Sequence, residues 1–251
     1  MSKKIIAEGA ISKVKQFLKP ILIKFRLYRL CKPIWDILKY ISSGVQFILG
    51  VSLFFLPDII RFRRIKKKRF KKLVIVSHPD DESLFFSQEL LCKEKVTAVF
   101  CLTNGYNWVR RREFYRALHY YHLNGYIMKL PDQTMFSFLF NQKNVYRRIH
   151  RLWELYSGCE SVYTHNPEGE YGHFHHQMIH SIVTETFGKS KVKIPVSRKM
   201  IQDKKYLLNQ RKLAEKKYIF DQFYTSQADI VQKYIPDYFE HEKLVQALSF
   251  R

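Results

Sequence analysis

Cysteine is scarce in this chain, and its placement excludes a disulfide-stapled scaffold. The 251 residues include four cysteines, which are widely spaced and form no C-x-x-C pair. Two of them lie in apolar runs, as buried thiols usually do. The basic start of the chain is not followed by the apolar core of a cleaved signal peptide. We therefore expect the protein to work in a reducing compartment, the cytoplasm of a bacterium.

Acidic residues are scarce in residues 1–72, which hold 19 Lys and Arg against three acids. Their net charge of +16 leaves only +6 for the rest of the chain. Residues 11–40 alternate basic and apolar side chains at helical spacing, a pattern suited to an anionic membrane surface. Nine of the twelve residues from Arg61 to Lys72 are basic, and each would attract lipid headgroups by roughly 1 kcal/mol. A solvated face and a nucleic-acid patch are the alternatives, although no interleaved aromatic platform favours nucleic acid.

A long apolar run is also missing. Residues 40–56 carry no charge, but seventeen residues lie at the lower limit for a spanning helix, and polar residues interrupt them. We favour an in-plane or re-entrant membrane anchor, with a helical hairpin packed against the rest of the chain as the alternative. The expected division is a basic, partly apolar helical extension over 1–71 and a globular domain over 72–251.

Strand-like and helical patterns alternate in the second part. Buried strands are predicted at 73–76, 96–102 and 126–130, with helices between them. The segment 192–196 is also predicted as a strand, and its proline indicates that it lies at the edge of the sheet or at a strand end. Residues 237–248 are predicted as a terminal helix. The alternation predicts an α/β fold, a three-layer αβα Rossmann-like arrangement with a mostly parallel sheet.

Metal-binding side chains gather where the first predicted strand ends. His78 and Asp81 stand three positions apart on a short turn, with Asp80 between them as a candidate base. Open α/β sheets place their sites at the carboxyl ends of parallel strands. The same acids could merely cap a helix. A second polar cluster, residues 164–177, also follows a strand-like run and is rich in histidine, which weakens that simpler interpretation.

Five blocks in order carry a family resemblance. They are H-P-D-D-E at 78–82, T-N-G at 103–105, T-H at 164–165, Y-G-H-x-x-H at 171–176 and Y-x-S-Q at 224–227. Together they resemble the PIG-L / LmbE-like zinc-dependent de-N-acetylases, from about Leu73 to about Gln227. Members of that family remove acetyl from an N-acetylglucosamine unit of a lipid-linked or small-molecule glycoside.

The resemblance implies a role for each matching residue. One Zn²⁺ per chain, with Fe²⁺ as the alternative divalent metal, would be held by His78, Asp81 and His176. The alternatives for a ligand position are the other histidines of the same region, His165, His173, His175 and His180. Asp80 would be the general base, with Tyr171 serving the oxyanion and His173 the leaving group; either Asp80 or His173 could be the general acid. Substrate contacts are implied for Asn104, Arg110, Asp132 and His165. A surface ion pair with Glu113 is the alternative for Arg110, and a supporting position behind the ligands is the alternative for His165.

The family resemblance and the basic extension over residues 1–71 together predict a function. We expect a metal-dependent amide hydrolase that deacetylates an N-acetylhexosamine, GlcNAc first, of a lipid-linked glycan or glycolipid such as the lipopolysaccharide core. The expected partner is an anionic membrane, at the cytoplasmic face of the bacterial inner membrane, with peripheral or monotopic attachment. One alternative is a non-catalytic membrane-bound glycan or nucleic-acid binding protein. Another is a metal-dependent phosphoesterase, which would usually need more carboxylates for two metal ions. Oligomeric state is not predicted.

Overall fold

The computed structural model describes residues 37–38, 41–42, 44–45, 47–49, 55–92, 96–132 and 137–250. The chain divides into two compact units, residues 1–45 and 46–251. Most of the predicted amphipathic segment, and much of the uncharged segment 40–56, lie outside the described residues. Among the helices of the described part, none is both long and apolar enough to cross a membrane.

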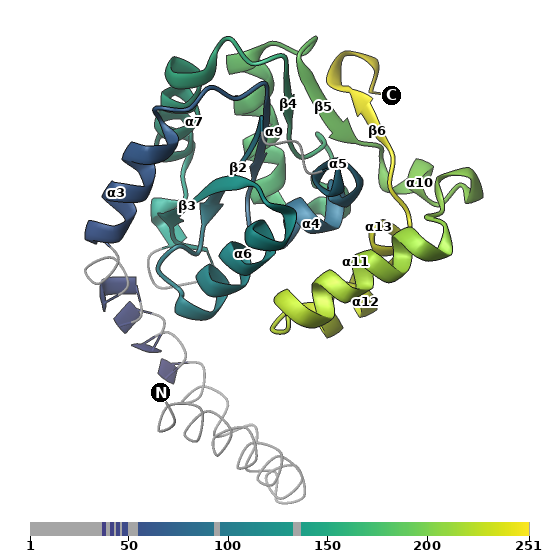
Figure 1. Ribbon diagram of the computed structural model, residues 1–251, viewed down its shortest axis with the longest axis horizontal. Helices are drawn as coiled ribbons and strands as arrows, with labels where there is room; N and C mark the ends of the chain where they lie inside the picture. Colours follow the sequence, from purple (N-terminus) through teal and green to yellow (C-terminus); the bar gives the residue numbers. More distant parts are fainter. Residues whose placement is uncertain are drawn as a thin grey trace, which may run out of the picture. The chain divides into compact units, whose positions relative to one another are not determined.

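One six-stranded sheet forms the centre of the second unit (Figure 1). Across the sheet the order is β3 (Asn124–Leu130), β2 (Thr97–Thr103), β1 (Lys72–Val76), β4 (Ser161–Tyr163), β5 (Val192–Pro195) and β6 (Leu244–Gln246). The first five strands are parallel, and β6 is antiparallel to β5. The predicted α/β fold with a mostly parallel sheet is confirmed.

Two predictions about the end of the chain need correction. The segment 192–196 is not an edge strand, because β6 pairs along its outer side, although Pro195 does end β5. Residues 237–248 do not form one helix: α13 (Pro236–Glu240) ends before β6 begins. Leu244–Gln246 pairs antiparallel with the outer side of β5, and this strand pairing replaces the helix there.

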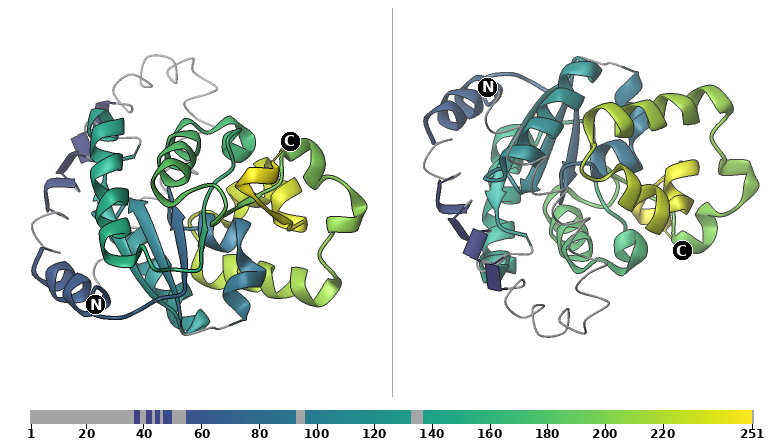
Figure 2. Two further views of the ribbon diagram at one scale, coloured as in Figure 1. Left: turned by 90° about the horizontal axis from the view of Figure 1, so that it is seen from above. Right: turned by 90° about the horizontal axis from the view of Figure 1, so that it is seen from below.

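Helices cover both faces of the sheet (Figures 1 and 2). They are α3 (Phe55–Ile65), α4 (Asp81–Phe85), α5 (Ser87–Leu91), α6 (Trp108–Tyr121), α7 (Gln142–Tyr156), α8 (Gly169–Gly172), α9 (Phe174–Phe187), α10 (Arg198–Ile201), α11 (Gln210–Phe223), α12 (Ala228–Tyr234) and α13. Short 3₁₀ turns occur at Ser137–Leu139, Lys204–Tyr206 and Ala247–Ser249. Two of the long helices, α7 and α9, pack against each other.

Side chains of β1 alternate between two hydrophobic clusters. Val74 and Val76 belong to the cluster formed with α4, α6, α11, α12 and α13. Leu73 and Ile75 belong to the other, formed with α7 and α9. All four are fully buried, as expected for a central parallel strand with both faces covered. This buried strand fixes the position of the turn that follows it.

Candidate metal centre

The candidate ligands come from two neighbouring strand ends. His78 lies in the turn after β1, and Asp81 is the first residue of α4. His176 lies in the first turn of α9, which follows β4. Because β1 and β4 are adjacent and parallel, their carboxyl ends meet at one edge of the sheet. The main-chain N–H of His78 donates to Oδ2 of Asp81 at 2.7 Å, which closes the turn.

The three ligand atoms form a nearly equilateral triangle. Oδ2 of Asp81 lies 3.3 Å from Nδ1 of His78 and 3.3 Å from Nε2 of His176. Nε2 of His176 lies 3.2 Å from Nδ1 of His78. Ligand atoms bound to a tetrahedral ion at about 2.1 Å would stand about 3.4 Å apart. The triangle therefore fits a metal ion with three protein ligands and a fourth position for water or substrate.

The electrostatics of the triangle also favour a cation. Burial alone would lower the pKa of His78, but Asp81 and Asp132 raise it to about 10. Burial would raise the pKa of Asp81, but His176 and His78 hold it well below its usual range. The carboxylates thus stabilise a positive charge at this position, which a divalent ion would supply in place of protons.

Glu170 orients His176 and His165. Its Oε2 accepts hydrogen bonds from Nδ1 of His176 at 2.7 Å and Nδ1 of His165 at 3.2 Å. With the proton of His176 on Nδ1, Nε2 is left as a lone pair for a metal. Although burial would raise the pKa of Glu170, the two histidines lower it to about 2. Glu170 itself has a strained φ of 56°, and such outliers collect at functional sites.

His165 is a support for the ligand set. It is fully buried, and its Nε2 accepts a hydrogen bond of 2.9 Å from the main-chain N–H of Ser77. Both ring nitrogens are therefore occupied, one by Ser77 and one by Glu170. We place His165 behind the metal ligands and not at a substrate, which corrects the substrate contact implied by the resemblance.

Asp132 faces the second nitrogen of His78. Its Oδ1 lies 3.5 Å from Nε2 of His78 and 3.3 Å from Nδ1 of His175. Asn104 completes this side, donating to Asp132 at 3.5 Å and to Oγ1 of Thr103 at 3.2 Å. Despite burial, His175 and His78 lower the pKa of Asp132. Such a carboxylate can fix the tautomer of a metal-binding histidine. The structure places Asn104 and Asp132 beside the ligands, where Asp132 remains partly exposed.

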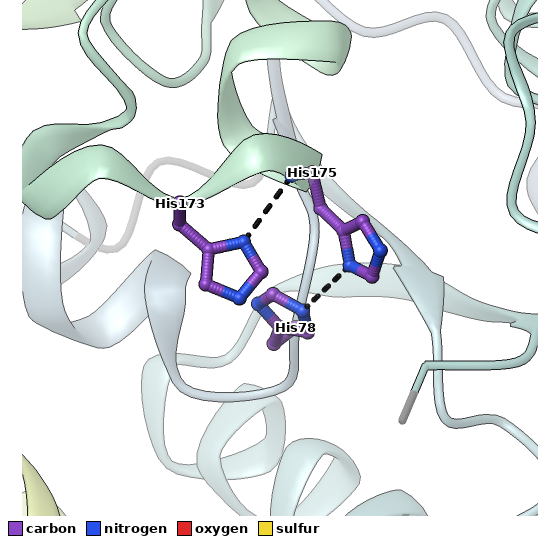
Figure 3. Close-up of side chains that lie close together, drawn as sticks. All are labelled: His78, His173 and His175. Carbon is purple, nitrogen blue, oxygen red and sulfur yellow. Dashed lines mark hydrogen bonds between the residues drawn. The ribbon is translucent and has the colours of Figure 1, made fainter. Parts of the chain in front are cut away.

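His173 and His175 flank His78 at the start of α9 (Figure 3). The ring of His173 lies 4.7 Å from that of His78 and 4.5 Å from that of His176. Nδ1 of His173 accepts the main-chain N–H of His175 at 3.2 Å, so Nε2 carries its proton. Burial and the neighbouring histidines lower the pKa of His173 to about 3. It is therefore neutral and can donate a hydrogen bond, but it holds no spare proton near neutral pH.

Tyr171 lies next to these rings. Its ring is 5.7 Å from that of His173 and 5.5 Å from that of His176. Burial, with the nearby Asp81 and Asp80, raises the pKa of Tyr171 far above its usual range. The phenol keeps its proton at any working pH. It can donate a hydrogen bond to a developing negative charge.

Asp80 is the only carboxylate of the H-P-D-D-E block that pairs with an arginine among the described contacts. Its Oδ1 accepts a hydrogen bond of 3.0 Å from Arg110, which also donates to the carbonyl of Pro79. Asp80 has φ of 125°, a conformation that L-residues rarely adopt. Burial raises the pKa of Asp80 to about 6, partly offset by Arg110. A carboxylate in that range is suited to accept a proton near neutral pH.

Arg110 itself turns inward, toward the turn that holds Asp80. It is 9% exposed, with its guanidinium held between Asp80, the Pro79 carbonyl and Glu113 at 3.5 Å. These contacts orient Asp80, and the substrate contact predicted for Arg110 stays a prediction. The alternative of a surface ion pair with Glu113 is wrong, because both residues are buried.

Two buried glutamates lie behind Asp80, Glu82 and Glu113, and the sequence did not predict that either supports it. Glu113 accepts hydrogen bonds from the main-chain N–H and the hydroxyl of Ser226, at 2.8 Å and 2.7 Å. Glu82 accepts hydrogen bonds from the hydroxyl of Tyr224 and from the main-chain N–H of Asp80 at 3.2 Å. The Y-x-S-Q block thus supports the base from behind. The sequence showed the position of this block in the order of the five blocks. It did not show which residues the block contacts.

A family model matches the segment that contains this site. Residues 73–187 match the model of the PIG-L family, described as GlcNAc-PI de-N-acetylase. This segment is similar to the PIG-L family. The matched segment runs from β1 to the end of α9 and contains all three candidate ligands. The resemblance predicted from the sequence is confirmed, and the family is one of deacetylases.

Three other proteins are similar to this chain. "Uncharacterized protein L374" of Acanthamoeba polyphaga mimivirus is 30% identical over 128 residues, 45% of this chain. The chain spans 56% of the length of that protein. The 4-carboxy-2-hydroxymuconate hydratase GalB of Pseudomonas putida KT2440 matches with a TM-score of 0.50 and 16% identity, over 68% of this chain and 83% of that one. The A40926 pseudoaglycone deacetylase Dbv21 matches with a TM-score of 0.47 and 12% identity, over 67% and 86%.

Proposed function

We propose that this protein is a metal-dependent hydrolase that removes the N-acetyl group from an N-acetylhexosamine. The observation that carries the proposal is the triangle of His78, Asp81 and His176, with ligand atoms 3.2 to 3.3 Å apart and an independent carboxylate, Asp80, beside it. A protein that only bound a glycan would not need a buried base next to a metal site. The family described as GlcNAc-PI de-N-acetylase supplies the reaction class.

The chemistry divides between the metal and the side chains around it. When bound, the ion would act as a Lewis acid toward the amide carbonyl and the attacking water. Asp80 accepts the proton of that water, and Tyr171 donates a hydrogen bond to the oxygen on which negative charge develops. His173 is neutral, so Asp80 carries the proton to the departing amine. The products are acetate and a free amino sugar.

We propose Zn²⁺ as the ion. Two imidazoles and one carboxylate are a donor set that catalytic zinc uses with its fourth position open. The same set of two histidines and one carboxylate also suits non-haem Fe²⁺, which is the alternative. Of the carboxylates around the triangle, Asp80 pairs with Arg110 and Glu170 accepts from two histidines. They do not form the larger set of carboxylate ligands that a two-metal phosphoesterase usually has.

The positive charge of the first 72 residues is our reason for proposing a lipid-linked substrate. The first 72 residues carry a net charge of +16, which would hold the protein at an anionic surface. We propose GlcNAc on a glycolipid, such as the lipopolysaccharide core, as the substrate. The corresponding site of action is the cytoplasmic face of a membrane, in a bacterium the inner membrane, with peripheral or monotopic attachment.

Acetate release tests the proposal. The full-length protein would be treated with a chelator, reloaded with Zn²⁺ or Fe²⁺, and incubated with a soluble GlcNAc glycoside and with a GlcNAc glycolipid in mixed micelles. We expect acetate and free amine in equal amounts, only after reloading, and faster turnover on the glycolipid. If neither substrate yields acetate with the metal fully loaded, the proposed reaction is wrong. Acetate from the soluble glycoside alone would contradict only the lipid-linked substrate.

A further inference from the structure

A pocket lies at the β3 edge of the sheet. Its volume is about 410 Å³, and it lies among α3, β3 and α7. The lining residues are Ile59, Phe62, Tyr126, Met128, Lys129, Arg147, Arg148, Arg151 and Leu152. None of the candidate metal ligands or their supports is among them. The pocket is therefore separate from the catalytic machinery, and neither the family match nor the proposed reaction uses it.

The lining combines an apolar floor with a basic wall. Five of the nine lining residues are apolar or aromatic, four are basic, and none is acidic. The rings of Phe62 and Tyr126 lie 5.2 Å apart, and the guanidinium of Arg151 sits over Phe62 at 5.0 Å. Such a wall favours a ligand with an anionic head and a short apolar stem.

Positive charges are crowded in this wall. Arg148 is half-buried and donates to the carbonyl of Asn144 at 3.0 Å. Burial, together with repulsion from Arg147, lowers the pKa of Arg148. An anion would relieve that repulsion. Arg147 and Arg151 are exposed on the same helix, where they can reach such a ligand from solvent.

We propose that this pocket binds an anionic phospholipid of a membrane surface, with the phosphate against the arginines of α7 and the first methylenes over Phe62 and Met128. The volume suits part of one lipid molecule. Exposed basic residues of α3 and the turn after it, Arg63, Arg64, Lys66, Lys67, Lys68 and Arg69, extend the same charge beyond the pocket. Ile60, on the same helix, is 48% exposed and available for apolar contact with the bilayer.

The pocket and the metal centre are connected through β3 and the two residues that follow it. Lys129 of β3 lines the pocket, and Asp132, three residues later, lies 3.5 Å from His78. A lipid bound at β3 would hold the adjacent catalytic edge of the sheet near the bilayer. This consequence rests on the proposed function, whereas lipid binding itself does not.

Vesicle binding by the full-length protein tests the pocket. The double variant Arg147→Gln/Arg151→Gln removes two charges from the pocket wall, both from exposed side chains. Arg211→Gln/Lys217→Gln removes two exposed charges from α11 and serves as the matched control. Each protein would be sedimented with vesicles of phosphatidylcholine alone and with added phosphatidylglycerol, without substrate, after equal melting temperatures are established.

The expected result is selective. For vesicles with phosphatidylglycerol, the pocket variant should lose roughly thirtyfold in partition coefficient, the effect of two headgroup contacts by basic residues, while the control loses less than threefold. Neither should change binding to phosphatidylcholine alone. Equal losses in both variants would show attraction by net charge and overturn the pocket. Release of the wild-type protein from vesicles by free glycerol phosphate would also overturn it, since the pocket would then take a soluble phosphate.

Discussion

Arg110 of α6 donates a hydrogen bond of 3.0 Å to Oδ1 of Asp80, in the turn before α4. The same guanidinium binds the carbonyl of Pro79 and contacts Glu113, which Ser226 anchors in turn. The base is therefore fixed by a chain of buried contacts that begins far away in the sequence. This arrangement has a measurable consequence for the pH dependence of turnover.

Arg110→Met should lower kcat by about tenfold or more and move its acid limb to higher pH. Asp80 accepts a proton only when ionised, and its pKa is about 6 with Arg110 in place. Because the guanidinium lowers that pKa, its loss raises it, so activity should fall away sooner as pH drops. The pH profile of kcat measures the shift. Arg112→Met, an exposed neighbour on the same helix, should leave the profile unchanged.

Asp80→Asn should keep the metal and lose turnover by two orders of magnitude or more, as expected for a lost general base. Asparagine preserves the shape of the side chain but cannot accept the proton of the attacking water. Metal content and kcat would be measured on the same preparation. Loss of the metal together with turnover would make Asp80 part of the ligand set instead.

Tyr171→Phe should lower kcat by roughly a hundredfold with little change in KM. The substitution removes one hydroxyl that we expect to matter only as negative charge develops. Steady-state kinetics on a soluble GlcNAc glycoside separate the two constants. An unchanged kcat would mean that Tyr171 only packs beside the histidines. Tyr218→Phe, on the exposed side of α11, is the control.

Glu82→Gln should flatten the pH dependence of stability. Burial raises the pKa of Glu82 from 4.5 to about 7. The folded state then binds a proton that the unfolded state has released, so the free energy of unfolding of the wild type falls as pH rises from 4.5 to about 7. Because one pKa unit corresponds to about 1.4 kcal/mol, removing Glu82 should reduce that fall in the free energy of unfolding by on the order of 3 kcal/mol. Urea unfolding of chelated protein at both ends of the range measures it, and equal slopes in both proteins would refute the assignment.

The sequence predicted the fold and the place of the site because their signals are local. Leu73 to Val76 is an apolar run, and the histidine and acids that follow it are consecutive. The supports of the site are not local. Glu170 is recognisable as the partner of His176 only when the turn after β4 has folded, and Arg110 turns inward because Asp80 and Glu113 meet it there.

Non-local contacts that the sequence does not show also decide the structure at the end of the chain. A helical pattern extends through residues 237–248, yet Glu242 accepts hydrogen bonds from the hydroxyl of Ser87 at 2.6 Å and the main-chain N–H of Gln88 at 2.9 Å. Beyond it, Leu244–Gln246 pairs with β5. Tertiary contacts from α5 and an open strand edge outweighed the local helical preference, and neither is visible in the pattern of these residues alone.

Metal content per chain tests the central claim most directly. Wild-type protein, His78→Ala, His176→Ala and Asp80→Asn would be loaded with Zn²⁺, dialysed and measured by elemental analysis. Because His78, Asp81 and His176 supply the three ligand atoms, wild type and Asp80→Asn should each retain one ion per chain, and either alanine variant should lose most of it. Full zinc in His176→Ala would contradict the ligand assignment.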